Sequence, residues 1–169
     1  MLSLAPQFCG SHLTDGKDWS HCVILEDLCA GFSKPNILDL QVGQRHVGSC
    51  EAGSATTLGL RMNGTRRHTV DGPVHRNKEW SNTLTTHKFP EELENFLTDS
   101  SGTLRAEVAG TVLQFLDQLE PWVMSQTGIQ LLGTSLLVVY EGDVTVVNHY
   151  LYTILAILAR SPFAVTLKS

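Results

Sequence analysis

The sequence lacks the short motifs that define several common enzyme folds and metal sites. It contains no GxGxxG and no GxxxxGK[ST] segment, so it predicts neither a Rossmann domain nor a P-loop. Its 4 cysteines form no CxxC pair and its 7 histidines no HxH or HxxxH pair, so no zinc site or disulfide framework is indicated. The first residues lack a basic stretch followed by an apolar core, so no secretory leader is expected. We therefore expect reduced thiols in a cytosolic or nuclear protein.

Charged residues are few and unevenly distributed. They make up 17% of the 169 residues, against 42% hydrophobic residues, which is typical of one folded domain. The net charge of -5 excludes a general nucleic-acid binder. Residues 41–78 nevertheless hold six basic and two acidic side chains. A local positive field of this kind suits a small polyanion, although a solvated basic surface would give the same pattern.

The first half of the chain has the apolar pattern of β-strands. Residues 1–20 show no sustained period and predict a loop or frayed start. The Asn63-Gly64 dipeptide predicts a hairpin turn. The expected strands span residues 21–28, 37–42, 56–62 and 65–70.

The second half changes to helical spacing. Pro90 and the acidic residues after it predict a helix start near Phe89. Apolar residues at spacings of three and four predict a long amphipathic helix over residues 104–127, ended by Gly128. Residues 134–140 are β-branched and apolar, which predicts a buried strand. Strands followed by helices, without a βαβ rhythm, define the fold class as α+β.

Val144 to Ala159 forms an apolar tail that contains Asn148 and His149. It is shorter than the roughly 20 residues that a helix needs to cross a bilayer. We interpret it as a buried helix or one that binds a partner. A marginal membrane segment and non-native sequence from an altered reading frame remain open as alternatives.

Residues 35–43 have the sequence PNILDLQVG, which resembles the PxxxDxKxG signature of the inositol polyphosphate kinases. Other segments resemble further motifs of that family, in the family's order. They are residues 23–28 (VILEDL), 43–48 (GQRHVG), 54–61 (SATTLGLR), 76–78 (RNK) and 134–142 (TSLLVVYEG). Each segment is weak by itself, but the ordered set is most similar to the inositol hexakisphosphate kinases.

The resemblance implies an α+β fold of two lobes, inositol polyphosphate kinase-like and related to ATP-grasp and protein kinases. It divides the chain into an irregular segment (1–20), a partial kinase-like domain (21–143) and an apolar tail outside the family pattern (144–169). Two family elements are not found: the amino-terminal strand with the ATP-binding lysine, and the Ile-Asp-Phe aspartate that binds Mg²⁺. The fold is thus expected to be incomplete at both ends.

The resemblance also implies an ATP site. Glu26, Asp27 and Leu28 match the hinge whose backbone holds adenine, and Asp39 matches the aspartate that binds the ribose. Gln41 stands where the family has the lysine that reaches the transferred phosphate. From the residues alone, Asp39 could also be a strand-end carboxylate, and Glu26 with Asp27 an ordinary loop.

The substrate implied by the resemblance is an inositol polyphosphate. Its phosphates would be bound by the basic side chains of the matched segments, because guanidinium and ammonium groups form charge-assisted hydrogen bonds with phosphate. These candidates are Arg45, Arg61, Arg76 and Lys78. The implied cofactors are ATP and Mg²⁺. We expect a monomer that binds neither nucleic acid nor membrane.

The predicted function is therefore a kinase that transfers the ATP γ-phosphate to an inositol polyphosphate. Gln41 donates a hydrogen bond but carries no charge, and loss of such a cation costs roughly 10²–10³ in rate. Two alternatives stay open. One is a pseudokinase or regulatory fragment that binds nucleotide, inositol phosphate or a partner without catalysis. The other is a fragment that does not fold alone.

Overall fold

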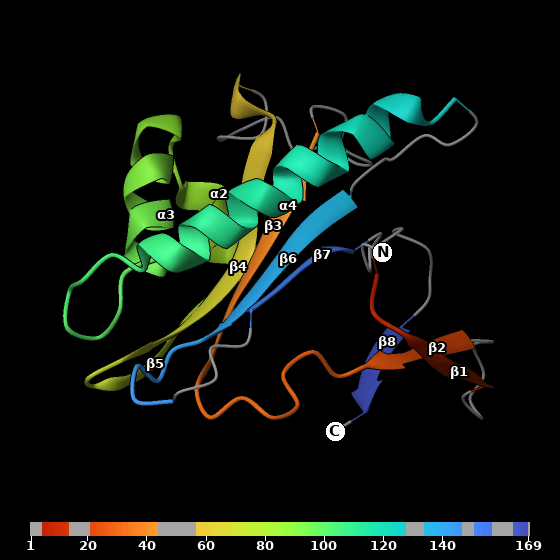
Figure 1. The fold of residues 1–169 in the computed structure, drawn as a ribbon, viewed down its shortest axis with the longest axis horizontal. Helices are drawn as coiled ribbons and strands as arrows, with labels where there is room; N and C mark the ends of the chain where they lie inside the picture. Colours follow the sequence, from red (N-terminus) through yellow and green to blue (C-terminus); the bar gives the residue numbers. More distant parts are fainter. Residues whose placement is uncertain are drawn as a thin grey trace.

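The computed structural model describes residues 5–13, 21–43, 57–127, 134–146, 151–156 and 164–168. These residues form two sheets (Figure 1). The smaller sheet has the strand order β1-β2-β8, with β2 antiparallel to β1 and parallel to β8. Its strands are β1 (Phe8–Leu13), β2 (His21–Glu26) and β8 (Ala164–Lys168).

The larger sheet is antiparallel throughout and has the order β5-β4-β3-β6-β7. Its strands are β3 (Pro35–Val42), β4 (Leu60–Thr69), β5 (Gly72–Arg76), β6 (Thr134–Glu141) and β7 (Leu151–Ala156). β3 lies at the centre, paired along its length with β6 and with β4. Strands, helices and their arrangement confirm the predicted α+β class.

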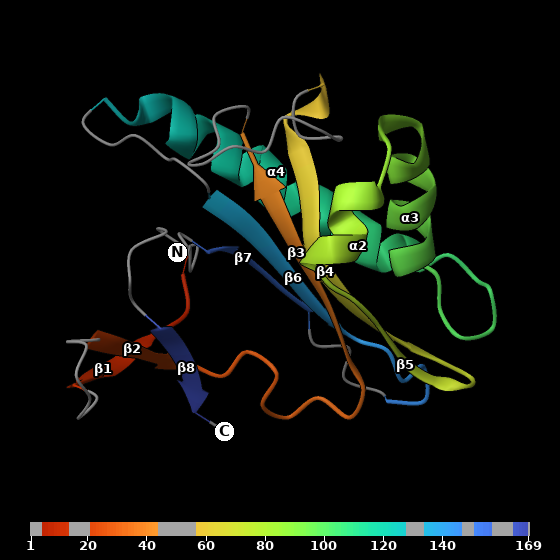
Figure 2. The same cartoon turned by 180° about the vertical axis from the view of Figure 1, so that it is seen from behind.

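The two faces of this sheet have different roles, because alternate residues of a strand point to opposite faces. Leu38, Leu40 and Val42 belong to the main hydrophobic core, which the helices cover. We call that side the helical face. Asp39 and Gln41 alternate with these residues and lie on the other side, which we call the Asp39 face. Figures 1 and 2 show the long helix crossing one side of the sheet only.

The helices are formed by the segment of chain between β5 and β6. They are α2 (Lys78–Thr83), the 3₁₀ turn η1 (Thr86–Lys88), α3 (Phe89–Phe96) and α4 (Ala106–Ser125). Pro90 lies in the first turn of α3, as predicted, where its missing N–H needs no partner. The long amphipathic helix is also confirmed, ending at Ser125, whereas Gly128 lies outside the described residues. The short helix α2 was not predicted.

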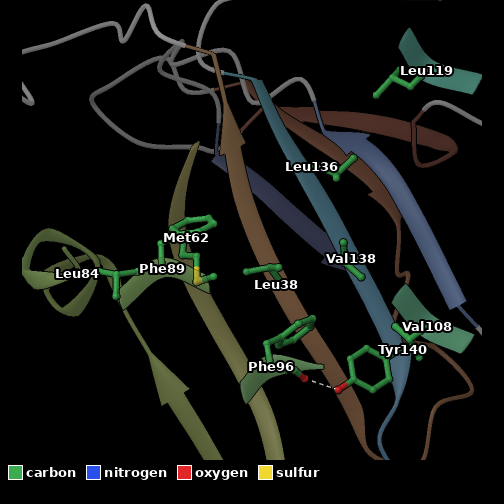
Figure 3. Close-up of a cluster of buried hydrophobic side chains, with 10 residues drawn as sticks. All are labelled: Leu38, Met62, Leu84, Phe89, Phe96, Val108, Leu119, Leu136, Val138 and Tyr140. Carbon is green, nitrogen blue, oxygen red and sulfur yellow. Dashed lines mark hydrogen bonds between the residues drawn. The ribbon is translucent and has the colours of Figure 1, made fainter. Parts of the chain in front are cut away.

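Figure 3 shows the main core between these helices and the sheet. Leu38, Met62 and Val138 project from three neighbouring strands and are at most 2% exposed. The Tyr140 ring meets Phe96 edge to face, with centroids 5.3 Å apart, and its hydroxyl donates a hydrogen bond to the Phe96 carbonyl. That bond satisfies a buried polar group while the ring adds to the apolar contact.

The segment between β2 and β3 is attached to the sheet by the carboxylate of Glu141, which is 1% exposed. Ser33 N–H donates to Oε2 at 2.7 Å, and Lys34 N–H donates to Oε1 at 2.9 Å. The N–H of Asp143 also donates to Oε1, at 2.8 Å. One buried side chain thus satisfies three backbone donors from two separate segments.

Two predictions about the first half of the chain are wrong. The Asn63-Gly64 dipeptide makes no turn, because β4 runs straight through it to Thr69. A register shift opposite Asp39 accommodates one extra residue there, which is a β-bulge. The hairpin turns instead after Thr69, and β5 begins at Gly72. Within residues 1–20, expected to be a loop, the structure has strand β1.

The apolar tail is also different from the prediction. Residues 151–156 form strand β7, which pairs with β6, rather than a helix. The apolar residues of this tail include Val, Ile, Leu and Tyr, types that fit a strand as well as a helix. In the described part of the chain, no helix combines the length and apolarity that a membrane span requires.

Replacing Glu141 by Gln should destabilise the fold by about 1.5–3 kcal/mol. The amide keeps one acceptor oxygen, but its NH₂ group then faces a backbone N–H donor in a buried site. Urea denaturation of both proteins measures the change. Glu120→Gln, at an exposed position of α4, removes the same charge and should stay within about 0.5 kcal/mol of wild type. Equal stability of all three proteins would contradict the anchoring role of Glu141.

Candidate functional site

Asp39 lies in the middle of the central strand, opposite Gly64 on β4 and Leu137 on β6. Its side chain is half-buried. The amide of Asn63 donates to Asp39 Oδ1 and to Ser135 Oγ, both at 3.4 Å. The β-bulge places Asn63 on this face, so the bulge joins a carboxylate, an amide and a hydroxyl across three strands.

Gln41 lies on the same face, two residues further along β3, opposite Arg61 and Ser135. Ser135 is 2% exposed, so its hydroxyl belongs to the buried part of this network. Asn63 was missed by the sequence reasoning because Asn-Gly is the strongest short hairpin signal. No local feature of the sequence distinguishes a bulge from a turn at this dipeptide.

The segment predicted as the adenine hinge reaches the Asp39 face through Leu28. That side chain is buried against Val139 and Ile37, in a second small cluster that includes Phe32. Ile37 is two residues before Asp39 on β3 and therefore shares its face. The end of β2 is thus held next to the Asp39 face by apolar packing.

Glu26 and Asp27 each form a hydrogen bond, one at the end of β2 and one in the turn that follows it. The N–H of Glu26 donates to the Gln7 carbonyl at 2.8 Å, which extends the pairing with β1. The carboxylate of Asp27 accepts the Cys29 N–H at 2.9 Å and so closes the turn after β2. Burial, followed by the nearby Asp27 charge, raises the pKa of the Cys29 thiol.

The structure separates the four residues predicted to bind phosphates. Arg61 is buried, and its guanidinium donates to Ser81 Oγ at 3.2 Å and to Asn82 Oδ1 at 2.6 Å, which fixes α2 against β4. Lys78 is exposed at the first residue of α2. Arg45 lies outside the described residues.

Arg76 is not brought together with Asp39. It pairs with Thr65 on β4, and Thr65 pairs with the core residue Leu38, so all three lie on the helical face. Its guanidinium lies 5.4 Å from the centroid of the Trp80 ring, a cation–π contact.

A divalent metal has no evident ligand set in the described ranges. Within them, no three His, Cys, Asp or Glu side chains gather closely enough to hold an ion. Asp39 is the carboxylate of the network on its face, and its amide and hydroxyl neighbours suit a hydroxyl-bearing ligand. The geometry therefore fits sugar recognition better than metal coordination.

The part of the Asp39 face near the start of β3 is basic. Arg66 pairs with Ile37 and so lies on that face, with Lys34 and His68 close by. Burial, then the Arg66 and Lys34 charges, lower the pKa of His68 below its ordinary value of 6.5. Its Nε2 atom is buried without a hydrogen-bond partner. The neutral imidazole is therefore the form that the folded state favours.

Similarity to solved structures identifies the fold. A solved inositol phosphate multikinase aligns with a TM-score of 0.65 at 20% identity, covering 79% of this chain and 71% of that chain. The Saccharomyces cerevisiae multikinase in complex with ADP and Mn²⁺ aligns with a TM-score of 0.62 at 21% identity, covering 83% of this chain and 66% of that chain. These similarities show that the fold is that of the inositol phosphate multikinases.

Sequence comparison then defines the family. The family model described as inositol polyphosphate kinase matches residues 22–152. Mouse inositol hexakisphosphate kinase 3 is 26% identical over 136 residues, which is 72% of this chain and 34% of the relative. Human inositol hexakisphosphate kinase 2 is 27% identical over 71% of this chain and 32% of its own length. The chain belongs to the inositol polyphosphate kinase family, and it spans about one third of the length of these relatives.

The half-buried position of His68, close to Arg66 and Lys34, predicts an acid-sensitive fold. Because the folded state lowers its pKa, the unfolded chain binds a proton first as the pH falls below about 6.5. Unfolding free energy should therefore decrease from that pH down to the pKa of the folded state. His68→Gln should make this decrease smaller in urea titrations between about pH 8 and 5. His87→Gln, at an exposed position, retains His68 and should retain the decrease; loss of the decrease in this control would contradict the assignment.

Proposed function

We propose that this chain takes part in transferring the γ-phosphate of ATP to an inositol polyphosphate, with both ligands bound against the Asp39 face. One observation carries the proposal. Asp39 and Gln41 share a face of the central strand, and Leu28 holds the end of β2 at the same face. This arrangement brings together the proposed ribose-binding carboxylate of Asp39, the proposed phosphate-binding amide of Gln41 and the backbone near Leu28.

The nucleotide would use three features of this region. The backbone around Leu28 supplies hydrogen-bonding groups for adenine, and Asp39 is an acceptor for the ribose hydroxyls. The apolar cluster around Leu28 and Val139 packs beneath these two groups. The ADP complex of the yeast multikinase, which has this fold, supports the same ligand class here. A bound divalent cation would neutralise phosphate charge.

The inositol polyphosphate would meet basic side chains near the start of β4, where Arg61 pairs with Gln41 and holds α2. Lys78 is exposed and free to reach a phosphate, while Arg61 acts as a positioning residue because it holds the helix that presents Lys78. Arg45, in the segment between β3 and β4, is proposed to add a third cation. We assign these different roles because Arg61 is buried and Lys78 is exposed.

Gln41 favours a second candidate function, which is binding without turnover. Phosphoryl transfer depends on neutralising the charge that spreads over the γ-phosphate oxygens. A glutamine amide donates a hydrogen bond there but brings no positive charge. The chain would then hold nucleotide and inositol phosphate as a non-catalytic binding protein.

Restoring the cation should separate the two candidates. With radiolabelled ATP and inositol hexakisphosphate, we expect slow transfer by wild type and transfer about 10²–10³ faster by Gln41→Lys, because a charge is returned to the γ-phosphate. Gln114→Lys adds the same charge at an exposed position of α4 and should leave the rate unchanged. Binding of both ligands without transfer by either wild type or Gln41→Lys would establish the second candidate. Absence of binding would exclude both.

Asp39→Asn tests the ribose assignment. The amide presents an NH₂ group where a carboxylate oxygen accepted the ribose hydroxyls, so ATP should bind about 10-fold more weakly. Calorimetric titration of ATP into the full chain measures this change. Asp117→Asn, at an exposed position of α4, is the matched control and should bind ATP like wild type. Unchanged ATP affinity in Asp39→Asn would remove Asp39 from the site.

A further inference from the structure

A pocket of about 240 Å³ lies on the helical face of the sheet, between the β4–β5 hairpin and α3. It is lined by Thr65, Arg67, Thr69, Val74, Arg76, Glu92, Asn95 and Phe96. Strand pairing shows on which side of the sheet the strand residues of the pocket lie. Thr65 pairs with Leu38 of the main core, and Arg67, two residues further along β4, pairs with Val74. The pocket is therefore on the opposite side of the sheet from Asp39.

Two guanidinium groups line this pocket, and each is held by a contact other than a salt bridge. Arg76 is positioned over the Trp80 ring. Arg67 donates from Nη2 to the Asp99 carbonyl at 3.3 Å, while its Nε is buried without a hydrogen-bond partner. In the described residues, the salt bridges within 4.0 Å involve Lys34 and Arg105 but neither of these arginines.

A buried donor without an acceptor costs free energy, and so does holding two like charges along one wall. An oxyanion would relieve the repulsion between the two charges. Guanidinium groups bind phosphate oxygens through paired, charge-assisted hydrogen bonds, and two of these groups line the pocket. Thr65 and Asn95 add a hydroxyl and an amide.

The size of the pocket limits the ligand. Its 240 Å³ correspond to about eight water molecules at roughly 30 Å³ each. This is below the roughly 300–1,000 Å³ typical of pockets for drug-sized molecules. It admits one or two phosphoryl groups but not a fully phosphorylated ring. Glu92 offsets part of the positive charge, which favours an anion of modest charge.

We infer that this pocket is a second anion site, which binds a phosphoryl or pyrophosphoryl group through Arg67 and Arg76. It is separate from the Asp39 face, because adjacent residues of β4 point to opposite sides of the sheet. The site is independent of the proposed kinase function, since that proposal does not use the residues that line the pocket. Arg76, which the sequence resemblance assigned to the substrate, lies on the opposite face from Asp39.

The test is an NMR titration of the ¹⁵N-labelled full chain with inorganic pyrophosphate. Saturable shifts are expected at the Thr65 and Asn95 amides and at the arginine Nε–H groups, with a dissociation constant of about 1 mM or tighter. Arg76→Gln, at an exposed position, should weaken binding about 10-fold, and Arg67→Gln should do the same. Glu92→Gln should tighten binding about 2–5-fold, because it removes a repelling charge.

Arg66→Gln is the matched control, since it removes the same charge from the next residue of β4 but on the Asp39 face. It should retain wild-type affinity within about twofold. Equal weakening by Arg66→Gln would show a general charge effect and overturn the proposal. So would shifts reproduced by sodium chloride at matched ionic strength, absence of saturation, or a response confined to residues around Asp39.

Discussion

Glu141 joins three parts of the chain that are distant in sequence. Its carboxylate accepts backbone N–H groups from Ser33, Lys34 and Asp143, and its carbonyl accepts a hydrogen bond from buried Arg105 at 3.3 Å. A carboxylate buried to this degree is tolerated only where hydrogen bonds replace its lost hydration, and three backbone donors do so here. The linker after β2, the end of β6 and the start of α4 are consequently fixed relative to one another.

The residues around Glu141 reinforce this junction. Lys34 and Asp143 form a salt bridge of 2.8 Å on its surface. Gly142 permits the close approach of the linker, since a Cβ atom there would lie 2.8 Å from the Lys34 carbonyl oxygen and 2.9 Å from the Asn36 amide nitrogen. A backbone oxygen at that distance cannot move aside cheaply. The path of the linker therefore depends on a buried acid and on the absence of a side chain next to it.

The linker in turn determines what lies beside the Asp39 face. Because residues 33 and 34 are held at the end of β6, the preceding turn returns along the sheet and buries Leu28 against Val139. This packing brings the end of β2 to the strand that carries Asp39. The junction at Glu141 is not assigned to ligand binding, yet it sets the geometry of the proposed nucleotide site.

Much of the fold could be predicted from the sequence where a periodic pattern was long or strongly punctuated. The central strand β3, the buried strand β6 and the two amphipathic helices α3 and α4 were found for this reason. The failures share one physical cause, which is that tertiary pairing overrides local signals. Asn63-Gly64 forms a bulge because β4 continues through it, paired with β3 and then with β5, and residues 151–156 form a strand because β6 offers an edge.

The candidate site shows the same limit at the level of single side chains. Spacing alone placed Asp39 and Gln41 on one face of one strand, because a period of two is a local property. It could not place Arg76, whose orientation depends on the register between β5 and β4 and on the bulge that shifts it. One extra residue at Asn63 changes which arginines of β4 lie on the Asp39 face and which lie on the helical face. The bulge therefore separates two groups of cations that the sequence presents as one basic stretch, and it gives each face of the sheet a different capacity for phosphate.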